Sequence, residues 1–144
     1  MSAMPTTPKK IRLTIAQKVS KQRTLQGVET IRYTVDAKGR ALGRVASEAA
    51  SALLGKKSAH YVKNFVLPVE VEITNASKLV IGEKKMLQKE YTRYTGYPGG
   101  LRIQTLAMLK EKKGIEEVIR KAVDGMIPRN SLRKERMKRL TISL

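Results

Sequence analysis

The amino-acid sequence predicts an α/β protein in which helices cover both faces of a mainly parallel β-sheet. Segments with the two-residue apolar alternation of strands are followed by segments with helical apolar spacing, and short turns join them. This order is typical of βαβ units, in which each helix carries the chain back across a face of the sheet. The length of 144 residues fits one domain, which we place at residues 30–144.

Residues 1–29 precede this domain as a basic extension. They contain six Lys or Arg residues and one acidic residue, Glu29, and their apolar residues are too sparse to suggest a share in the core. A segment of this kind either remains a solvated tail or orders along RNA. We expect the second, with Lys9, Lys10 and Arg12 as RNA contacts.

The domain begins with a strand, a turn and a helix, which form the first half of a βαβ unit. Residues 31–36 alternate apolar and polar side chains, and residues 37–40 form the turn. Gly55 stands where a glycine commonly follows the last turn of a helix. The apolar residues of this helix recur at helical spacing: Leu42, Val45, Ala46, Ala49 and Leu53.

The middle of the chain is predicted to add two strands and a long loop. Residues 69–73 alternate strictly, residues 75–78 can form one helical turn, and residues 79–82 form a third short strand that ends at a glycine. Residues 84–102 are polar, basic and aromatic and contain several Gly and Pro residues. We therefore expect a long loop there, with some extended structure.

The last part of the domain is predicted to be helical, with a fourth strand at its end. Residues 105–112 form one helix, and a longer helix from Ile115 ends at Pro128. A short basic helix over residues 132–138 and a strand over residues 140–143 follow. The longer helix has a clean apolar stripe: Ile115, Val118, Ile119, Ala122, Val123 and Met126.

The charge of the chain indicates a polyanionic partner. Thirty Lys and Arg residues against twelve Asp and Glu residues give a net charge of +18. Such a charge repels itself, and bound phosphates offset the repulsion while releasing their condensed counterions. An anionic membrane would instead call for a basic amphipathic helix with bulky apolar residues, but Trp is absent and Phe65 is the single Phe. Nucleic acid is therefore the favoured partner.

The composition argues against catalysis and against a membrane protein. The chain has no cysteine and one histidine, His60, so thiolate or histidine-clustered metal sites and the usual catalytic triads are not available. Its acidic residues are scattered, and we expect no catalytic residue, no cofactor, no metal and no small-molecule substrate. No apolar run reaches the ~18 residues of a membrane span, and residues 1–27 lack the apolar segment of a secretory signal. We expect a soluble, cytoplasmic protein.

Two motifs around the first helix are candidates for phosphate contact. A helix N-terminus presents free N–H groups to anions, although the glycine spacing here matches neither the dinucleotide-binding nor the P-loop pattern. The alternative is a simple tight turn. After the helix, lysines suit the negative end of its dipole and also form a compact basic cluster. The RNA-binding candidates in these motifs are Arg40, Gly43, Arg44, Lys56, Lys57 and Lys63.

The segment 91–102 is the most informative motif, because tyrosines, arginines and glycines are interleaved in it. Tyrosine rings can stack on unpaired bases, arginines contact phosphates, and paired glycines let another backbone come close. The alternative is that the tyrosines pack on the domain and the glycines merely turn the chain. The RNA-binding candidates are Arg93, Tyr94, Thr95, Gly96, Tyr97, Gly99, Gly100 and Arg102.

The C-terminal segment 126–144 is a further basic surface. It contains six Lys or Arg residues and one acidic residue, Glu135, whereas an ordinary solvated helix face would interleave more acids. We expect RNA contacts from Arg129, Arg133, Lys134, Arg136, Lys138 and Arg139.

The order and spacing of these motifs resemble the ribosomal protein L13 family of the large subunit. The likeness rests on residues 35–46, 54–56, 75–76, 95–101 and 122–128. It implies a three-layer α/β/α fold with a four-stranded, largely parallel sheet. It also implies binding to large-subunit rRNA, an early role in subunit assembly and contacts with neighbouring ribosomal proteins. By position, the implied rRNA contacts are the turn at Gly43 and Arg44, Lys56, the loop 93–100 and the basic residues after Pro128.

The chain departs from the family pattern at a few positions, and other functions stay open at this point. Arg32 stands where many members have Trp, Tyr94 stands where His is usual, and Pro68-Val69 replaces a common Gly-Asp pair. The alternatives are a free-standing nucleic-acid-binding protein or mRNA-binding translational repressor, and an α/β enzyme with a phosphorylated substrate. The enzyme would need a titratable group in a pocket, and no residue stands out for this role. Turnover that is lost on substitution of Asp36 or His60 would favour the enzyme.

Overall fold

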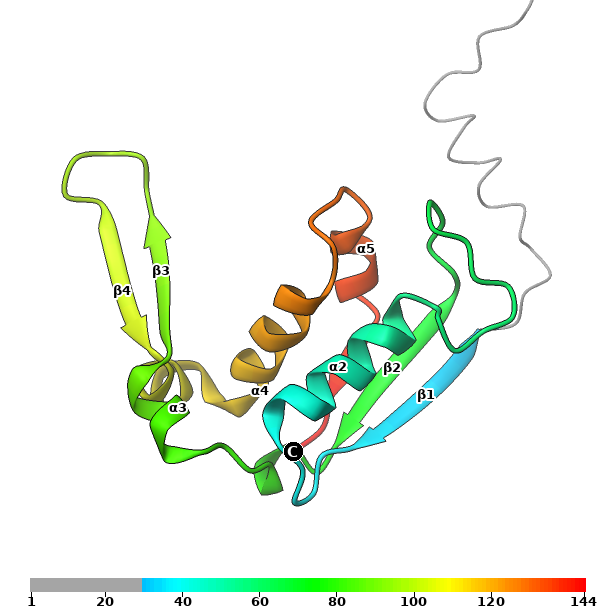
Figure 1. Ribbon diagram of the computed structural model, residues 1–144, viewed down its shortest axis with the longest axis horizontal. Helices are drawn as coiled ribbons and strands as arrows, with labels where there is room; N and C mark the ends of the chain where they lie inside the picture. Colours follow the sequence, from blue (N-terminus) through cyan, green and yellow to red (C-terminus); the bar gives the residue numbers. More distant parts are fainter. Residues whose placement is uncertain (1–29) are drawn as a thin grey trace, which may run out of the picture.

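A computed structural model describes residues 30–144 (Figure 1). The basic extension over residues 1–29, with the expected contacts Lys9, Lys10 and Arg12, lies outside the described residues. The elements in chain order are β1 (Ile31–Asp36), α2 (Leu42–Leu53), β2 (Val69–Thr74), the 3-10 turn η1 (Ala76–Lys78), α3 (Glu83–Gln88), β3 (Glu90–Tyr94), β4 (Leu101–Thr105), α4 (Leu106–Met126), α5 (Arg133–Met137) and β5 (Leu140–Ile142).

Strands β1, β2 and β5 form a parallel sheet with β2 at its centre. The register places Ile31 opposite Val69 and Val71 opposite Leu140. In β2 the apolar residues are buried, whereas Glu70 and Glu72 are exposed. The mixed α/β class and the parallel pairing predicted from the sequence are therefore confirmed.

The core lies between this sheet and the helices α2 and α4, which pack on each other. Four alanines of α2 are buried, and their small side chains let the helix approach its neighbours closely. From α4 the buried residues include Val118, Ile119 and Val123, which belong to the predicted apolar stripe. Thr105 caps α4 by accepting a hydrogen bond from the N–H of Met108.

Two features of the predicted sheet are not found in residues 30–144. The strand expected at residues 79–82 makes only one bridge, between Val80 and Ala41, because the chain enters α2 directly after Ala41 and offers no further partner. The sheet of the described residues therefore has three strands and not four. Its second face, with Thr34, Glu70 and Glu72, is exposed, so no third layer forms within these residues. The strict apolar–polar alternation of β2 agrees with a strand buried on one side.

The segment predicted as a long loop contains a helix and an antiparallel hairpin. Helix α3 precedes β3, and β3 pairs with β4 from Glu90–Thr105 to Tyr94–Leu101. A Cβ atom added at Gly100 would lie 1.9 Å from Thr95 Oγ1 and 2.9 Å from the carbonyl oxygen of Tyr97, which explains the glycine at this turn. The two helices predicted around residue 114 follow each other directly within α4, with a break at Gly114 (φ 79°).

Candidate RNA-binding surface

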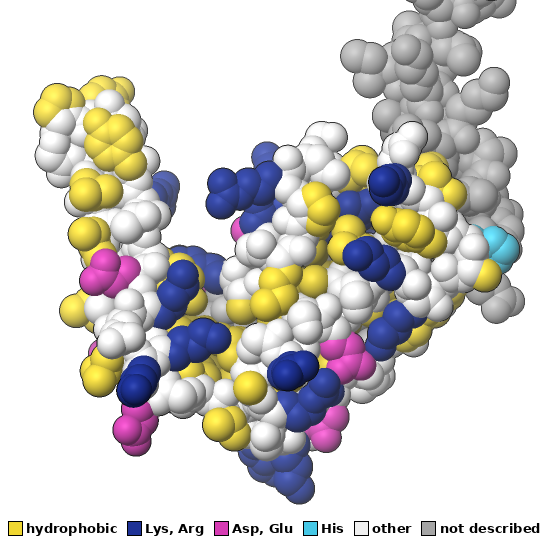
Figure 2. Space-filling view, viewed as in Figure 1, with side chains coloured by type: hydrophobic (Ala, Val, Ile, Leu, Met, Phe, Trp, Pro, Cys, Tyr) yellow, Lys and Arg dark blue, Asp and Glu magenta, His cyan; other side chains and the backbone are white. Residues whose placement is uncertain are grey.

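The hairpin stands away from the rest of the domain and leaves an open hollow beside α4 and α5 (Figures 1 and 2). Figure 2 shows Lys and Arg side chains on both sides of this hollow. Opposite residues of an antiparallel pair share one face of the ladder, and faces alternate along each strand. Tyr91, Arg93 and Arg102 therefore lie on one face, which we call the inner face.

Tyr91 shows which way the inner face points. Its ring is half-buried and lies 4.6 Å from Nζ of Lys121 on α4 and 5.6 Å from Nζ of Lys89. Burial raises the pKa of Tyr91. These cation–π contacts hold the base of the hairpin against α4. The inner face, with its two arginines, is consequently the one that faces α4 across the hollow.

The pair Arg93–Arg102 is electrostatically unfavourable in the free protein. The two residues are directly opposite in the register, and both are exposed. Like charges at such positions destabilise a hairpin by up to about 1 kcal/mol. An anion bound between the two guanidinium groups would remove this cost, and a phosphate matches the planar donor geometry of arginine.

A groove between α4 and α5 continues the basic surface. Its volume is about 490 Å³, and it is lined by Glu117, Arg120, Lys121, Asp124, Arg133, Lys134 and Met137. Arg133 forms an ion pair with Asp124 and also donates to the carbonyl oxygen of that residue. Among residues 30–144, Arg120 and Lys134 make no ion pair and remain available for an external anion.

Arg120 and Lys121 were not among the residues predicted from the sequence. They lie on the polar side of the apolar stripe of α4, where a charged residue ordinarily means a solvated face. The excess of Lys and Arg over acids between residues 110 and 121 was the available signal, and it points to an anion-binding surface only once the hairpin is seen opposite.

Besides Arg133, two further predicted C-terminal contacts are engaged inside the protein. Arg136 is buried (2% exposed) and donates through Nη2 to the carbonyl oxygen of Phe65 at 3.1 Å. Arg139 donates to the carbonyl oxygen of Leu67. Both arginines therefore tie the segment before β2 to the C-terminal segment. Arg129, Lys134 and Lys138 are exposed.

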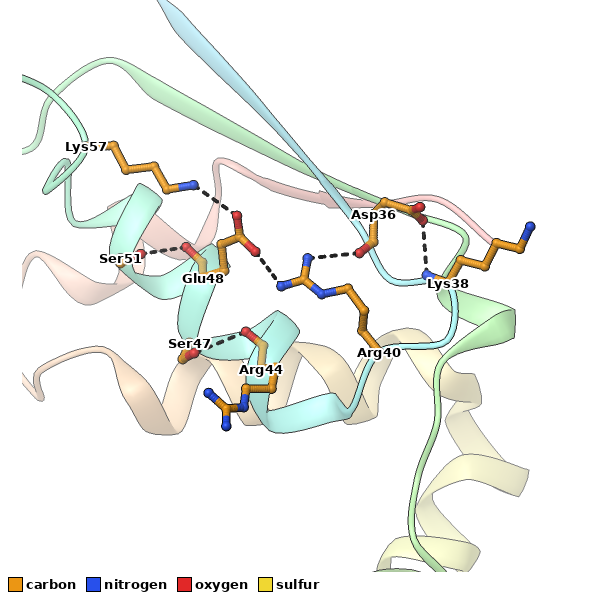
Figure 3. A network of polar contacts seen from close by, with 8 residues as sticks. All are labelled: Asp36, Lys38, Arg40, Arg44, Ser47, Glu48, Ser51 and Lys57. Atoms are coloured by element: carbon orange, nitrogen blue, oxygen red, sulfur yellow. Dashed lines mark hydrogen bonds and ion pairs between the residues drawn. The ribbon is translucent and has the colours of Figure 1, made fainter.

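Some of the basic residues around α2 are also engaged inside the protein, whereas others are exposed (Figure 3). Arg40 Nη2 lies 2.7 Å from Oε2 of Glu48, and Lys57 Nζ lies 3.1 Å from Oε1 of the same carboxylate. These hydrogen bonds, first from Arg40 and then from Lys57, lower the pKa of Glu48. The exposed Arg44 side chain extends away from this network, and Lys56 is also exposed.

The remaining sequence candidates have structural or surface positions. The hydrogen bond from the backbone N–H of Lys38, and then one from the side chain of Asn75, lower the pKa of Asp36. Asp36 thus braces the turn after β1. His60 and Lys63 are exposed in the loop after α2, and Gly43 is half-buried in the first turn of α2.

The tip of the hairpin carries exposed aromatic side chains. Tyr97 is 75% exposed and Tyr94 is 64% exposed. The tip is closed by a hydrogen bond from the N–H of Gly100 to the carbonyl oxygen of Tyr97. Tyr94 lies opposite Leu101 on the face away from α4, so the structure separates Tyr94 from Arg93 and Arg102.

These features together define a basic α/β protein with an exposed surface suited to polyanions. Residues 30–144 contain no group of three acidic or histidine side chains that could hold a metal ion, and no helix among them is long and apolar enough to cross a membrane. The family model of ribosomal protein L13 matches residues 30–143. The chain belongs to the ribosomal protein L13 family, and it is a structural ribosomal protein and not an enzyme.

Curated relatives agree with this assignment. The chain is 43% identical over 115 residues to the large ribosomal subunit protein uL13 of Moorella thermoacetica, covering 80% of this chain and 79% of the relative. It is 41% identical over 110 residues to the uL13 of Trichormus variabilis, with 76% and 72% covered. For the uL13 of Geobacter sulfurreducens the identity is 42% over 110 residues, with 76% of each chain covered.

Proposed function

We propose that this chain is a structural component of the large ribosomal subunit that binds large-subunit rRNA through the basic hollow and supports early subunit assembly. The hollow comprises the inner face of the hairpin and the groove between α4 and α5. The observation that carries this proposal is the Arg93–Arg102 pair, which faces the cations of α4 and makes no ion pair with another described residue. Relatives named as large-subunit proteins support the placement.

In this proposal the hollow takes up a segment of the phosphate backbone. Arg93 and Arg102 contact it from the hairpin, and Arg120 and Lys134 contact it from the opposite wall. Phosphate contacts fix the orientation of the protein on RNA, and the exposed Tyr97 at the tip can stack on an unpaired base.

A second basic surface at the ends of α2 extends the same binding mode. Arg44 at the N-terminal end and Lys56 after the C-terminal end are exposed. Arg40 and Lys57 neutralise Glu48, so the carboxylate does not repel a phosphate near Arg44. We include the N-terminal contacts Lys9, Lys10 and Arg12 in the proposal on the basis of their charge.

The test compares two double variants that remove the same charge. R93S/R102S removes the inner-face pair, and K38S/K78S removes two exposed lysines at the turn after β1 and at η1. We expect R93S/R102S to weaken binding to large-subunit rRNA and to reduce the slope of log affinity against log salt by about 0.7 to 0.9 for each phosphate that is no longer neutralised. The control should change both quantities much less.

Equal effects of the two variants would show that the hollow is not the binding surface. Sucrose-gradient sedimentation of the full chain tests the wider assignment. Co-sedimentation with the large subunit supports it, whereas a chain that binds mRNA and stays apart from ribosomes would be a free-standing nucleic-acid-binding protein.

A further inference from the structure

The hairpin has a second face that the proposed RNA contact does not use. On this outer face Tyr94 lies opposite Leu101, and Thr92 lies opposite Ile103. The exposed fractions are 64% for Tyr94, 57% for Leu101 and 55% for Ile103. Figure 2 shows hydrophobic side chains along the hairpin from its tip to its base. The domain itself therefore leaves a row of large apolar side chains in contact with water.

The charges of the hairpin are divided between its two faces. Both arginines of the strands lie on the inner face, whereas the outer face has no Lys or Arg within the strands and one acid, Glu90, opposite Thr105. A phosphate backbone gains nothing on this face and is repelled by Glu90. The matching surface is apolar at its centre and carries a Lys or Arg opposite Glu90, and a protein surface can offer both of these features.

The apolar row is also pre-organised for docking. Antiparallel pairing fixes the face on which Tyr94, Leu101 and Ile103 stand, so the backbone does not have to be ordered when a partner covers them. Contiguous exposed apolar patches on otherwise charged proteins mark interaction sites, and rigid aromatic anchors supply much of the energy of such interfaces.

We propose that the outer face of the hairpin is a docking site for a neighbouring protein of the large subunit. The partner covers Tyr94, Leu101 and Ile103 with apolar side chains and places a basic side chain against Glu90. The hairpin then joins rRNA on its inner face to a protein on its outer face. This inference rests on the proposed function, because it requires the chain to be in the subunit.

Leu101 and Arg102 allow a sharp test, because they are adjacent in the sequence and lie on opposite faces. A photo-reactive phenylalanine analogue is placed at either position of the full chain, and assembled large subunits are irradiated. We expect an adduct from position 101 that resists ribonuclease and contains a different protein, identified by mass spectrometry. From position 102 we expect an adduct that ribonuclease digests.

The outcomes separate this inference from the proposed function. An RNA adduct at position 101, or an adduct with a second copy of this chain, overturns the docking site while the position 102 adduct upholds RNA binding. A chain that does not enter subunits and gives no RNA adduct at position 102 overturns both. An absence of any protein adduct at position 101 in assembled subunits also overturns the docking site.

A pair of variants provides the second readout. L101T/I103T replaces the apolar row with β-forming polar residues and leaves every charge in place. We expect its affinity for isolated large-subunit rRNA to stay within about twofold, and its retention in subunits to fall by about 30-fold, as for an interface hot spot. R93S/R102S should instead lower the affinity for isolated rRNA, which L101T/I103T leaves nearly unchanged. Unchanged retention of L101T/I103T would contradict the docking site.

Discussion

At the scale of single residues, the cations of this protein have two different roles. Arg136 and Arg139 donate to backbone carbonyl oxygens, and Arg40 neutralises Glu48. Arg44 and Arg93 are exposed and make no ion pair within residues 30–144. The first group holds segments of the fold together, whereas the second group is available to phosphates. The amino-acid composition counts both groups as positive charge and does not distinguish their roles.

Replacement of Arg136 should destabilise the fold. The variant R136A leaves the partly buried carbonyl oxygen of Phe65 without its donor and opens a cavity at the buried arginine. We expect the free energy of unfolding to fall by about 2 to 3 kcal/mol in urea titrations. The neighbouring K138A variant removes an exposed lysine and should change it by less than about 0.5 kcal/mol. Equal decreases in the two variants would show that Arg136 is not a structural tie.

Glu48 should contribute to the dependence of stability on pH. Arg40 and Lys57 lower its pKa, so its stabilising effect is complete above the usual glutamate range and is lost as the pH falls through the lowered value. We expect E48Q to be less stable than the parent chain at neutral pH and to lose less stability on acidification. Urea unfolding at neutral and acidic pH measures this difference. The exposed E135Q variant is the control and should lose as much stability on acidification as the parent chain. An equal loss in E48Q would contradict the role of Glu48.

At the scale of elements, α4 is divided by Gly114. The residue has φ 79° and ψ 176°, a region of backbone conformation that is open mainly to glycine. The break lets the first part of α4 lie beside α3 and the hairpin while the second part packs on α2. The direction of the hairpin therefore depends on one backbone conformation.

Two glycines of α4 provide a matched test of this break. A Cβ atom at Gly114 or Gly125 would meet nothing within 4 Å, so steric contact does not distinguish them. We expect G114A to lower the free energy of unfolding by about 1 to 3 kcal/mol, because alanine is strained at this φ. G125A should raise it by up to about 1 kcal/mol, because Gly125 is helical and alanine favours helix. Chemical denaturation measures the free energy of unfolding of both variants. A G114A variant that is more stable than the parent chain would contradict the positive φ of Gly114.

At the scale of the whole molecule, the net charge of +18 opposes the folded state. The positive side chains around the hollow and at the ends of α2 repel one another when no polyanion is bound, and salt screens this repulsion over a Debye length of about 8 Å at physiological ionic strength. The isolated protein is therefore less stable than its core alone would make it, and an RNA ligand relieves the repulsion at the site where it is greatest.

The melting temperature of the isolated full chain should rise with salt. If salt lowers the repulsion between the positive charges by about 1 kcal/mol, the melting temperature rises by roughly 3 to 5 °C for a domain of this size. Thermal unfolding in low and physiological concentrations of a simple chloride salt measures it, and R93S/R102S should show a smaller rise than the parent chain. A melting temperature that is independent of salt would show that self-repulsion does not limit stability.

The sequence alone was sufficient for much of what depends on local order and on composition, although helix α3 and the hairpin were predicted as a loop. The alternation of β1 and β2, the apolar stripes of α2 and α4 and the final strand β5 were predicted at their observed positions. Five motifs, residues 95–101 among them, led to the family. The positive charge indicated a polyanionic partner. These properties are encoded in neighbouring residues or in sums over the chain, so no tertiary information is needed.

Only the tertiary structure decided the properties that depend on contacts between residues far apart in the sequence. Residues 79–82 have the composition of a strand but form a β-bridge only with Ala41. Arg136 donates to a carbonyl oxygen 71 residues away. The hairpin register assigns Tyr94 and Arg93 to opposite faces, although both were predicted to contact RNA. Hydrogen-bond partners, burial and the direction of a side chain are set by the residues that the fold brings opposite, and a single sequence does not contain these pairings explicitly.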